Sequence, residues 1–566
     1  MSHSWPLGTQ FNTIEMEVAE RKCSVCGIKM HVCDHRHRHV FSLSGPLHLL
    51  IRLLRCPDPD CPCHHRTFSP YEEFNITMPW WAMDWPLFSW IGHRRMARHW
   101  SVPQIRGELK DSYQIEMSED AIEKAIRRYQ IMLAAREQDP ARLAEEYKDT
   151  KDLVLSIDGL QPEKGHETLY VVRELRKKRV WFAESLISSS AEEVRRLIIK
   201  AREWAERLGL PVSLWISDKQ DAFVTGIAKE FEGVPHRYCD NHFLRDLAKP
   251  MLEMDSHTKV KMRKKIRGLR GIERDMLEPR AERDAETEDP NPRMSIAKDE
   301  HSPASPSTPD TDPSQAEEIV LDYCSAVRGI LNNDQGGPLR PPGIRMADAL
   351  REVQSSLHRN LDAEESHPAK KPLQRLAGYI GRGLEEVRDE QEEIRGILQD
   401  VHKVSATLDP DMGSSKERLA KFHSLQQQYE LDKHSIRQQM AKLMDSFSHG
   451  LFIGEDVLGF PTDNLDLERW FKNPKGHERR IHGHAHAGVR IVQEGPTLIL
   501  ALDAHLRHPA PFSQEDLYPY ADAKPPACQQ EAIHRRKVMR KARSSKMLPK
   551  LLQDLEQRYR DCSLTM

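Results

Sequence analysis

Six of the ten cysteines in this 566-residue chain lie in one short N-terminal stretch, at positions 23, 26, 33, 56, 61 and 63. Dense cysteines form disulfides in secreted domains, but the first residues show no charged segment followed by an apolar one, so we expect no secretory signal. Clustered thiols in a reducing compartment are typical of metal ligands. A stretch this short cannot build a large apolar core. We therefore expect residues 1–75 to fold around a metal ion.

Two pairs of these cysteines have the spacing of zinc-binding turns, Cys23-Ser-Val-Cys26 and Cys56-Pro-Asp-Pro-Asp-Cys61. Between them, Val40 to Arg55 predicts two strands joined at Ser44-Gly45-Pro46. Four thiolates satisfy tetrahedral Zn²⁺, so the pattern predicts a zinc ribbon. Other ligands stay open, namely Cys63 in place of Cys61, and Cys33, His31 and His35.

Residues 76–150 predict a helical segment in which Trp80, Trp81, Trp85, Trp90 and Trp100 supply a small core. Ser101 and Ser118 begin two short helices with a polar turn between them, which fits a helix-turn-helix. Lys124, Arg127 and Arg128 would then face DNA, as would His35, Arg36, His37 and Arg38 of the ribbon. The alternative is two ordinary packed helices with a solvated basic face.

Residues 151–250 predict an α/β domain with the element order β-β-β-α-β-α-β. Leu153 to Asp158 and Val212 to Asp218 are apolar strands that each end in an acid. Strands over 169–175 and 180–186, helices over 191–208 and 222–231, and a short strand over 236–240 complete the order. This is the order of the ribonuclease-H-like fold, in which Asp158 and Asp218 would end adjacent strands. Each acid alone would more often merely terminate a strand.

A third acid is expected from a helix near residue 465, in the last part of the core at 451–510. Asn464 and Glu468 lie on nearly one face of that helix, beside an apolar stripe that includes Trp470. Glu468 is therefore the predicted third acid. Asp463 is better explained as a helix cap, in competition with Thr462, and Asp466 points away from the Glu468 face. Carboxylates gathered in this way suit two Mg²⁺ ions about 4 Å apart.

The region from 251 to 450 predicts a helical insertion interrupted by a linker over 279–316, which is rich in Pro, Ser and acids. Heptad spacing over 384–401 and 419–447 predicts two long helices, which would form an antiparallel hairpin spanning 380–447. The alternative is two unrelated amphipathic helices of a bundle.

Local basic runs, rather than global charge, point to a nucleic-acid partner. The formal net charge is only −3. Two segments nevertheless hold seven positive residues in twelve, Lys259 to Arg270 and Arg535 to Lys546. The second segment lies in the predicted basic tail over 511–566. Such runs bind phosphates in a salt-sensitive manner, although many are only solvated faces. No apolar run reaches the roughly 20 residues of a membrane helix, so no membrane partner is expected.

The chain resembles the DDE transposases of bacterial insertion sequences, in particular the Mutator-like superfamily. The resemblance is carried by Asp158-Gly159, Ser217-Asp218, Cys239-Asp-Asn-His242, Asn464 with Glu468 and Phe471, and the basic continuation from Lys472 to Gly483. It covers 151–250 and 451–490 well, and 20–70 more loosely. A CxxH pair alone cannot complete a zinc site, so Cys239 and His242 are expected to pack or to position DNA.

The resemblance implies a ribonuclease-H-like core with an N-terminal zinc ribbon, a helical DNA-binding segment and a large all-α insertion. It also implies metal-dependent cleavage and strand transfer by Asp158, Asp218 and Glu468 with two Mg²⁺ ions, Mn²⁺ being able to substitute. The implied partners are element ends and target DNA, with a homodimer or larger oligomer on DNA at a bacterial nucleoid. Two alternatives are a catalytically silent DNA-binding protein derived from such an enzyme, and a ribonuclease-H-like nuclease or resolvase without strand transfer.

Overall fold

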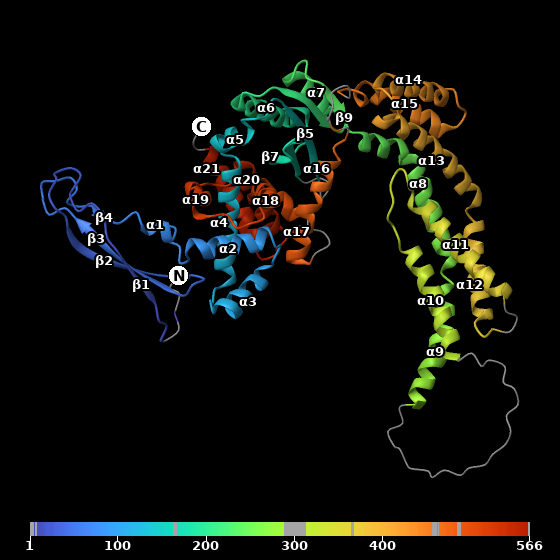
Figure 1. Ribbon diagram of the computed structural model, residues 1–566, viewed down its shortest axis with the longest axis horizontal. Coiled ribbons are helices and arrows are strands. Elements are labelled where there is room, and N and C mark those ends of the chain that lie inside the picture. Colours follow the sequence, from blue (N-terminus) through green and yellow to red (C-terminus); the bar gives the residue numbers. More distant parts are fainter. Residues whose placement is uncertain are drawn as a thin grey trace, which may run out of the picture. The chain divides into compact units, whose positions relative to one another are not determined.

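The computed structural model describes residues 5, 8–161, 167–287, 313–363, 367–454, 461, 463–483 and 488–563. The chain divides into two compact units, which we treat separately (Figure 1). Unit 1 comprises Met1–Cys239 and Gly459–Met566, and unit 2 comprises Asp240–Leu458. Among the helices of the described ranges, none has both the length and the apolar character of a membrane span.

The N-terminal module of unit 1 is a small sheet. Its strands are β1 (Asn12–Met16), β2 (His31–Val40), β3 (Leu47–Arg55) and β4 (Thr67–Phe68). The order is β1-β3-β2 with β4 also paired to β3, and β2 runs antiparallel to β3. The expected strand from Val40 to Leu43 was wrong, because Phe41 to Pro46 forms the connection and β2 precedes it. The sequence of β2, HVCDHRHRHV, is too polar for a pattern of apolar residues to predict a strand there.

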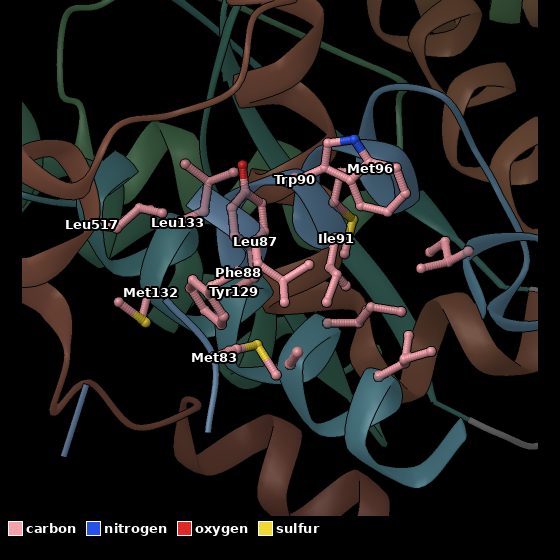
Figure 2. Packing of buried hydrophobic residues seen from close by; sticks show 14 of the residues in the cluster. Met83, Leu87, Phe88, Trp90, Ile91, Met96, Tyr129, Met132, Leu133 and Leu517 are labelled. Atoms are coloured by element: carbon pink, nitrogen blue, oxygen red, sulfur yellow. The ribbon is translucent and has the colours of Figure 1, made fainter. Parts of the chain in front are cut away.

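Helices then form a compact core. They are α1 (Glu73–Ile76), α2 (Trp85–Met96), α3 (Val102–Tyr113), α4 (Glu119–Glu137) and α5 (Pro140–Tyr147). Ser101 and Ser118 cap α3 and α4, which confirms the two predicted helix starts. Figure 2 shows Phe88 and Ile91 of α2 packed with Tyr129 and Leu133 of α4. The later half of α4 is thus a core helix.

The second sheet of unit 1 has five strands in the order β7-β6-β5-β8-β9. The strands are β5 (Leu153–Leu160), β6 (Thr168–Glu174), β7 (Arg179–Leu186), β8 (Val212–Ser217) and β9 (His236–Tyr238), with α6 (Ala191–Leu208) and α7 (Asp221–Glu230) between them in sequence. The strands β5, β6 and β7 are antiparallel neighbours, whereas β8 and β9 run parallel to β5. The predicted order of strands and helices is confirmed.

Helices cover both faces of this sheet (Figure 1). Leu155, Ile157 and Trp215 pack with α6 and α7 on one face. Leu169 and Val171 face the other way, toward α16 (Leu465–Trp470) and α18 (Gly488–Arg507). The remaining helices of unit 1 are α17 (Lys472–His482), α19 (Gln514–Leu517), α20 (Ala527–Ala542) and α21 (Leu548–Ser563), so the predicted basic tail is largely helical.

Unit 2 is helical in its described part. Its α-helices are α8 (Asp240–Ile266), α9 (Leu269–Thr287), α10 (Pro313–Leu331), α11 (Pro342–Ala363), α12 (Lys370–Glu385), α13 (Arg388–Leu408), α14 (Ser415–Glu430) and α15 (Ser435–Leu451). The predicted linker over 279–316 was too long, because α9 continues to Thr287 and α10 begins at Pro313. The rest of that linker lies outside the described residues.

The two long heptad helices predicted over 380–447 are not continuous, although the predicted turn at 409–413 does separate α13 from α14, which pack against each other. The second run is split into α14 and α15, because Asp432 and His434 interrupt it. The Asp432 carboxylate accepts a hydrogen bond from the His434 N–H (2.8 Å), and the His434 ring accepts one from the Ile436 N–H (3.3 Å), which starts a new helix. Helix α8 packs against α11, α12, α13 and α15. The heptad stripes therefore serve a bundle, as the alternative interpretation held.

Replacing 240–458 with a flexible linker of about ten residues should leave unit 1 folded. The two ends of unit 1 meet, because the Asn464 N–H donates to Cys239 Sγ at 3.2 Å, so a short loop closes the gap at little entropic cost. Thermal unfolding followed by circular dichroism should remain cooperative. Deleting only 380–447 should instead expose α8 and abolish the cooperative unfolding of unit 2. Loss of cooperative unfolding in the linker variant would show that unit 1 depends on unit 2.

Candidate active site

Asp158 lies near the carboxyl end of β5, where the apolar strand reaches the edge of the core. Its carboxylate accepts a hydrogen bond from the Gly159 N–H at 2.7 Å. A side chain at position 159 would come within 3.0 Å of both Thr168 and Tyr170 of β6. Glycine after the acid therefore lets β6 pack closely against the end of β5.

The register of β5 and β8 places Asp158 and Asp218 at matching positions. Ser156 of β5 pairs with Ile216 of β8 in parallel. Asp158 lies two residues further along β5, and Asp218 directly follows the end of β8 at Ser217. Neighbouring strands lie about 4.8 Å apart. Side chains two residues apart in a strand share one face of the sheet, so Asp158 belongs to the face of Ser156, which is opposite the Leu155 and Ile157 face.

The end of β8 is held in place by short-range hydrogen bonds. Ser217 Oγ donates to the Asp218 carbonyl at 2.7 Å and lies 2.8 Å from His236 Nε2 of β9. Burial lowers the pKa of His236 to about 4, so this ring is neutral near pH 7. The Cys239 N–H also donates to the Ser217 carbonyl at 2.8 Å. These bonds fix the backbone from which Asp218 projects.

Asn464 attaches the helix of the predicted third acid to this sheet. Its side-chain oxygen accepts a hydrogen bond from Ser156 Oγ, and its backbone N–H donates to Cys239 Sγ. Asn464 is fully buried and directly precedes α16. Glu468 lies one helical turn later, and its N–H donates to the Asn464 carbonyl at 3.0 Å. Asn464 therefore joins α16 to the strand that carries Asp158, a positioning role that sequence reasoning did not assign.

The competing acids of this segment have other partners. Asp463 accepts a hydrogen bond from the Leu465 N–H at 3.0 Å, and burial raises the pKa of its carboxyl. The predicted cap at Asp463 was wrong, because Asn464 occupies the N-cap position of α16. Asp466 pairs with Arg173 at 3.0 Å, and Arg173 also binds Asp503. Thr462, the other predicted cap, lies outside the described residues.

The three predicted acids come from three segments of unit 1 that meet at one end of its sheet. Within the described residues, Asp158, Asp218 and Glu468 are not a set whose carboxylate oxygens all lie within 4.8 Å of one another. Ligands of two metal ions about 4 Å apart can be more widely spaced than that, since each ion has its own shell. Cys239 Sγ lies within 4.8 Å of a Glu468 oxygen, so Cys239 packs beside the third acid.

A four-cysteine cluster is present in the N-terminal module. The sulfur atoms of Cys23, Cys26, Cys56 and Cys61 lie within 4.8 Å of one another, and three of these residues are buried. Cys63 is buried nearby but is not in this set, and Cys33 instead donates to the Leu53 carbonyl at 3.3 Å. The cluster can hold a structural metal such as zinc, with Cys61 as the fourth ligand.

The thiols of this cluster have opposed acidities. Backbone N–H groups of Cys26 and Val25 lower the pKa of Cys23 to about 6. The Cys63 N–H favours the Cys61 thiolate, but burial and the neighbouring sulfurs outweigh it and raise the pKa of Cys61 to about 12. One thiolate therefore forms readily and opposes the formation of others. A divalent cation is what makes four adjacent thiolates compatible.

The continuation from Lys472 to Gly483 forms α17, whose inner face is buried in unit 1. His477 Nδ1 lies 2.9 Å from His99 Nδ1, and Glu478 lines a polar cavity of about 170 Å³ together with Arg95 and Arg490. Burial raises the pKa of Glu478 to about 7. This part of the motif therefore contributes to packing.

Glu478→Gln should flatten the pH dependence of stability. A carboxyl whose pKa is raised in the folded state stabilises the fold below its unfolded value of 4.5, and this stability is lost as pH rises through about 7. At pH 8 the variant should be more stable by on the order of 2 kcal/mol. Urea unfolding at pH 5 and pH 8 measures this, with the exposed Glu232→Gln as control. An unchanged pH slope would contradict the prediction.

Several basic residues predicted to face DNA are paired within the protein. Arg36 and Arg38 both bind the buried Glu73. In the first basic run, Lys259 and Arg263 bind Asp334. Lys261 and Lys265 of the same run bind Glu390 and Glu386, and in the second run Arg535 and Arg536 bind Glu167. The runs therefore carry less available charge than their sequence indicates.

The two predicted DNA-binding helices keep part of their basic face. Arg128 turns inward and donates to the Ala523 carbonyl at 2.6 Å, so it is not available as predicted. Lys124 stays exposed beside Asp120, to which it is bonded at 2.9 Å.

Comparison of the whole chain with protein-family models and with curated proteins gives no match.

Proposed function

We propose that this protein is a DDE-type DNA transposase, in which Asp158, Asp218 and Glu468 bind two Mg²⁺ ions. The observation that carries the proposal is the meeting of three segments at one end of the five-stranded sheet. Asp158 and Asp218 occupy matching positions on parallel neighbours, and Asn464 bonds the Glu468 helix to β5. If Asp158 and Asp218 were only incidental residues at strand ends, nothing would require a buried asparagine that joins their sheet to the helix of a third acid.

The strand order of the sheet supports a ribonuclease-H-like core. Three antiparallel strands are followed by two strands parallel to the first, in the order β7-β6-β5-β8-β9. Helices α6 and α7 pack on one face, and α16 and α18 pack on the other. In the sequence, the helical unit 2 lies between β9 and α16, so the third acid follows a long insertion.

In the proposed reaction, the carboxylates of Asp158, Asp218 and Glu468 would hold the metal ions. Mg²⁺ supplies charge stabilisation for the attacking and leaving oxygens of a phosphodiester when bound. Asn464 and Cys239 hold α16 in register with the sheet end. The predicted zinc ribbon and the helices α3 and α4 would bind the ends of the mobile element, with DNA phosphates as partners.

The proposal is tested with DNA taken from both flanks of the gene, where a transposase predicts inverted repeats. The purified chain should nick these ends in Mg²⁺ or Mn²⁺ and join the freed 3′-hydroxyl to a plasmid. Nicking without joining would favour a nuclease or resolvase. Tight binding without nicking would favour a silent DNA-binding protein, and binding to neither flank would contradict the proposed function.

A further inference from the structure

Trp80 departs from the role that its sequence context predicts. Five tryptophans were expected to form a core, and Trp85 and Trp90 do so, but the Trp80 side chain is 96% exposed. Its backbone also has a φ of +66°, a region that bulky residues rarely adopt. Met78 and Met83, on either side, are buried, and Figure 2 places Met83 in the helical core. The loop is thus anchored at both ends while its tip presents an indole ring to solvent.

This conformation is braced from two directions. Arg38 of β2 donates to the carbonyls of Met78 and Trp81. Thr77 Oγ1 donates to the Met83 carbonyl at 2.6 Å. The Phe41 N–H donates to the Ala82 carbonyl at 2.8 Å, which ties the loop to the residue after β2. A strained backbone persists only where its surroundings over-determine it, so the exposure of Trp80 is built into the fold.

The surface beside Trp80 carries three basic side chains, although Lys124 is paired with Asp120 and Arg128 donates to the Ala523 carbonyl. A hollow of about 430 Å³ runs from Trp80 and Trp81 to the exposed side of α4, where Lys124, Arg127 and Arg128 line it. No acidic side chain is among the described residues that line this hollow. A second hollow, of about 690 Å³, is also lined by Trp80 and includes Phe74 and His37. The exposed ring of Trp80 therefore borders two open hollows, one of which is lined by Lys124, Arg127 and Arg128.

We propose that Trp80 stacks on an unpaired nucleobase of bound DNA while Lys124 and Arg127 contact the adjacent phosphates. The inference rests on the proposed function and adds a site to it. An indole offers a flat face to any base, so such stacking is tolerant of sequence. A basic rim complements phosphates. A second copy of the chain is less suited to this surface, because a stable interface needs a broad complementary patch.

The test uses the full-length protein and two DNA probes, a fully paired duplex and the same duplex with a small central mismatched bubble carrying 2-aminopurine. Wild type should bind the bubble roughly tenfold more tightly than the paired duplex, a ratio within the range for stacking one base. Binding should also quench the 2-aminopurine. Trp80→Ala should lose the preference and the quenching yet keep its affinity for the paired duplex, and Trp80→Phe should retain most of both.

Control variants separate the possible outcomes. Tyr559→Ala removes another highly exposed aromatic ring, 80% exposed on α21, and should behave as wild type. Lys124→Ala with Arg127→Ala should weaken binding to both probes. A Trp80→Ala protein that keeps the bubble preference would overturn the stacking proposal, as would loss of self-association in sedimentation with DNA binding unchanged. Wild type that binds neither probe would instead sink the proposed function.

Discussion

Replacing Asp158, Asp218 or Glu468 with the matching amide is expected to lower Mg²⁺-dependent cleavage of element-end DNA on the order of 1,000-fold or more. Each amide keeps the shape of the side chain but removes one negative ligand from the metal ions. Metal ions and other preorganised charges supply much of the transition-state stabilisation in phosphoryl chemistry, so losing one ligand has a large effect. Rates of strand nicking under single-turnover conditions measure it. DNA affinity should persist, because the proposed phosphate contacts lie on the N-terminal module and on α3 and α4.

The matched control is Asp466→Asn, two residues before Glu468 on another side of α16. Asp466 is 42% exposed and pairs with Arg173, which keeps Asp503 as a second partner. Its amide should cost little stability, which thermal unfolding checks, and should cleave at the wild-type rate. An inactive Asp466→Asn beside an active Glu468→Gln would mean that the third acid is misassigned. Full activity in all three acid variants would contradict the assignment of these acids as the catalytic site.

Cys23→Ser or Cys56→Ser is expected to remove the bound zinc and unfold the N-terminal module. The buried apolar residues of the module form two small clusters, Met30 and Leu54 beside the cysteines, and Met16, Val40, Leu47, Leu49 and Ile51 on β1, β2 and β3. Structural zinc sites contribute on the order of 10 kcal/mol to folding, so the loss of one ligand exceeds what such a small core can offset. Elemental analysis should fall from one zinc per chain to nearly none. Limited proteolysis should then cut within residues 12–68.

Cys33→Ser and Cys63→Ser are the matched controls for this prediction. Neither residue belongs to the four-sulfur set, although Cys63 is buried beside it. Both variants should therefore keep one zinc per chain and resist the protease. Loss of zinc in Cys63→Ser but not in a Cys61→Ser variant would show that Cys63, rather than Cys61, is the fourth ligand. A wild-type protein that contains no zinc would contradict the prediction that a metal ion stabilises this module.

The sheet that carries the candidate site was predictable from the sequence because its strands are apolar runs ended by sharp signals. Ser217-Asp218 marks the end of β8, Asp158-Gly159 lies one residue short of the end of β5 at Leu160, and the strand order followed from the alternation of strands and helices. Asn464 was noted only as a neighbour of Glu468 on a helix face. Its bond to Ser156 joins residues 308 positions apart, which no local pattern reveals.

Other features could not be predicted because distant partners decide them. The positive run from Lys259 looked available to DNA, yet Asp334, Glu386 and Glu390 neutralise much of it. The strand β2 escaped notice because its histidines and arginines do not alternate with apolar residues. The exposure of Trp80 depends on bonds from Arg38, so an indole that composition assigns to the core lies at the surface.

If Asp158, Asp218 and Glu468 share metal ions, iron-directed cleavage should cut the backbone beside all three. Fe²⁺ in place of Mg²⁺, with ascorbate and peroxide, produces hydroxyl radicals that cut the backbone next to the metal. Wild type should be cut near residues 158, 218 and 468, excess Mg²⁺ should suppress all three cuts, and Asp158→Asn should weaken them together. Cuts at only one of the three positions, or cuts that Asp158→Asn leaves unchanged, would contradict a shared site.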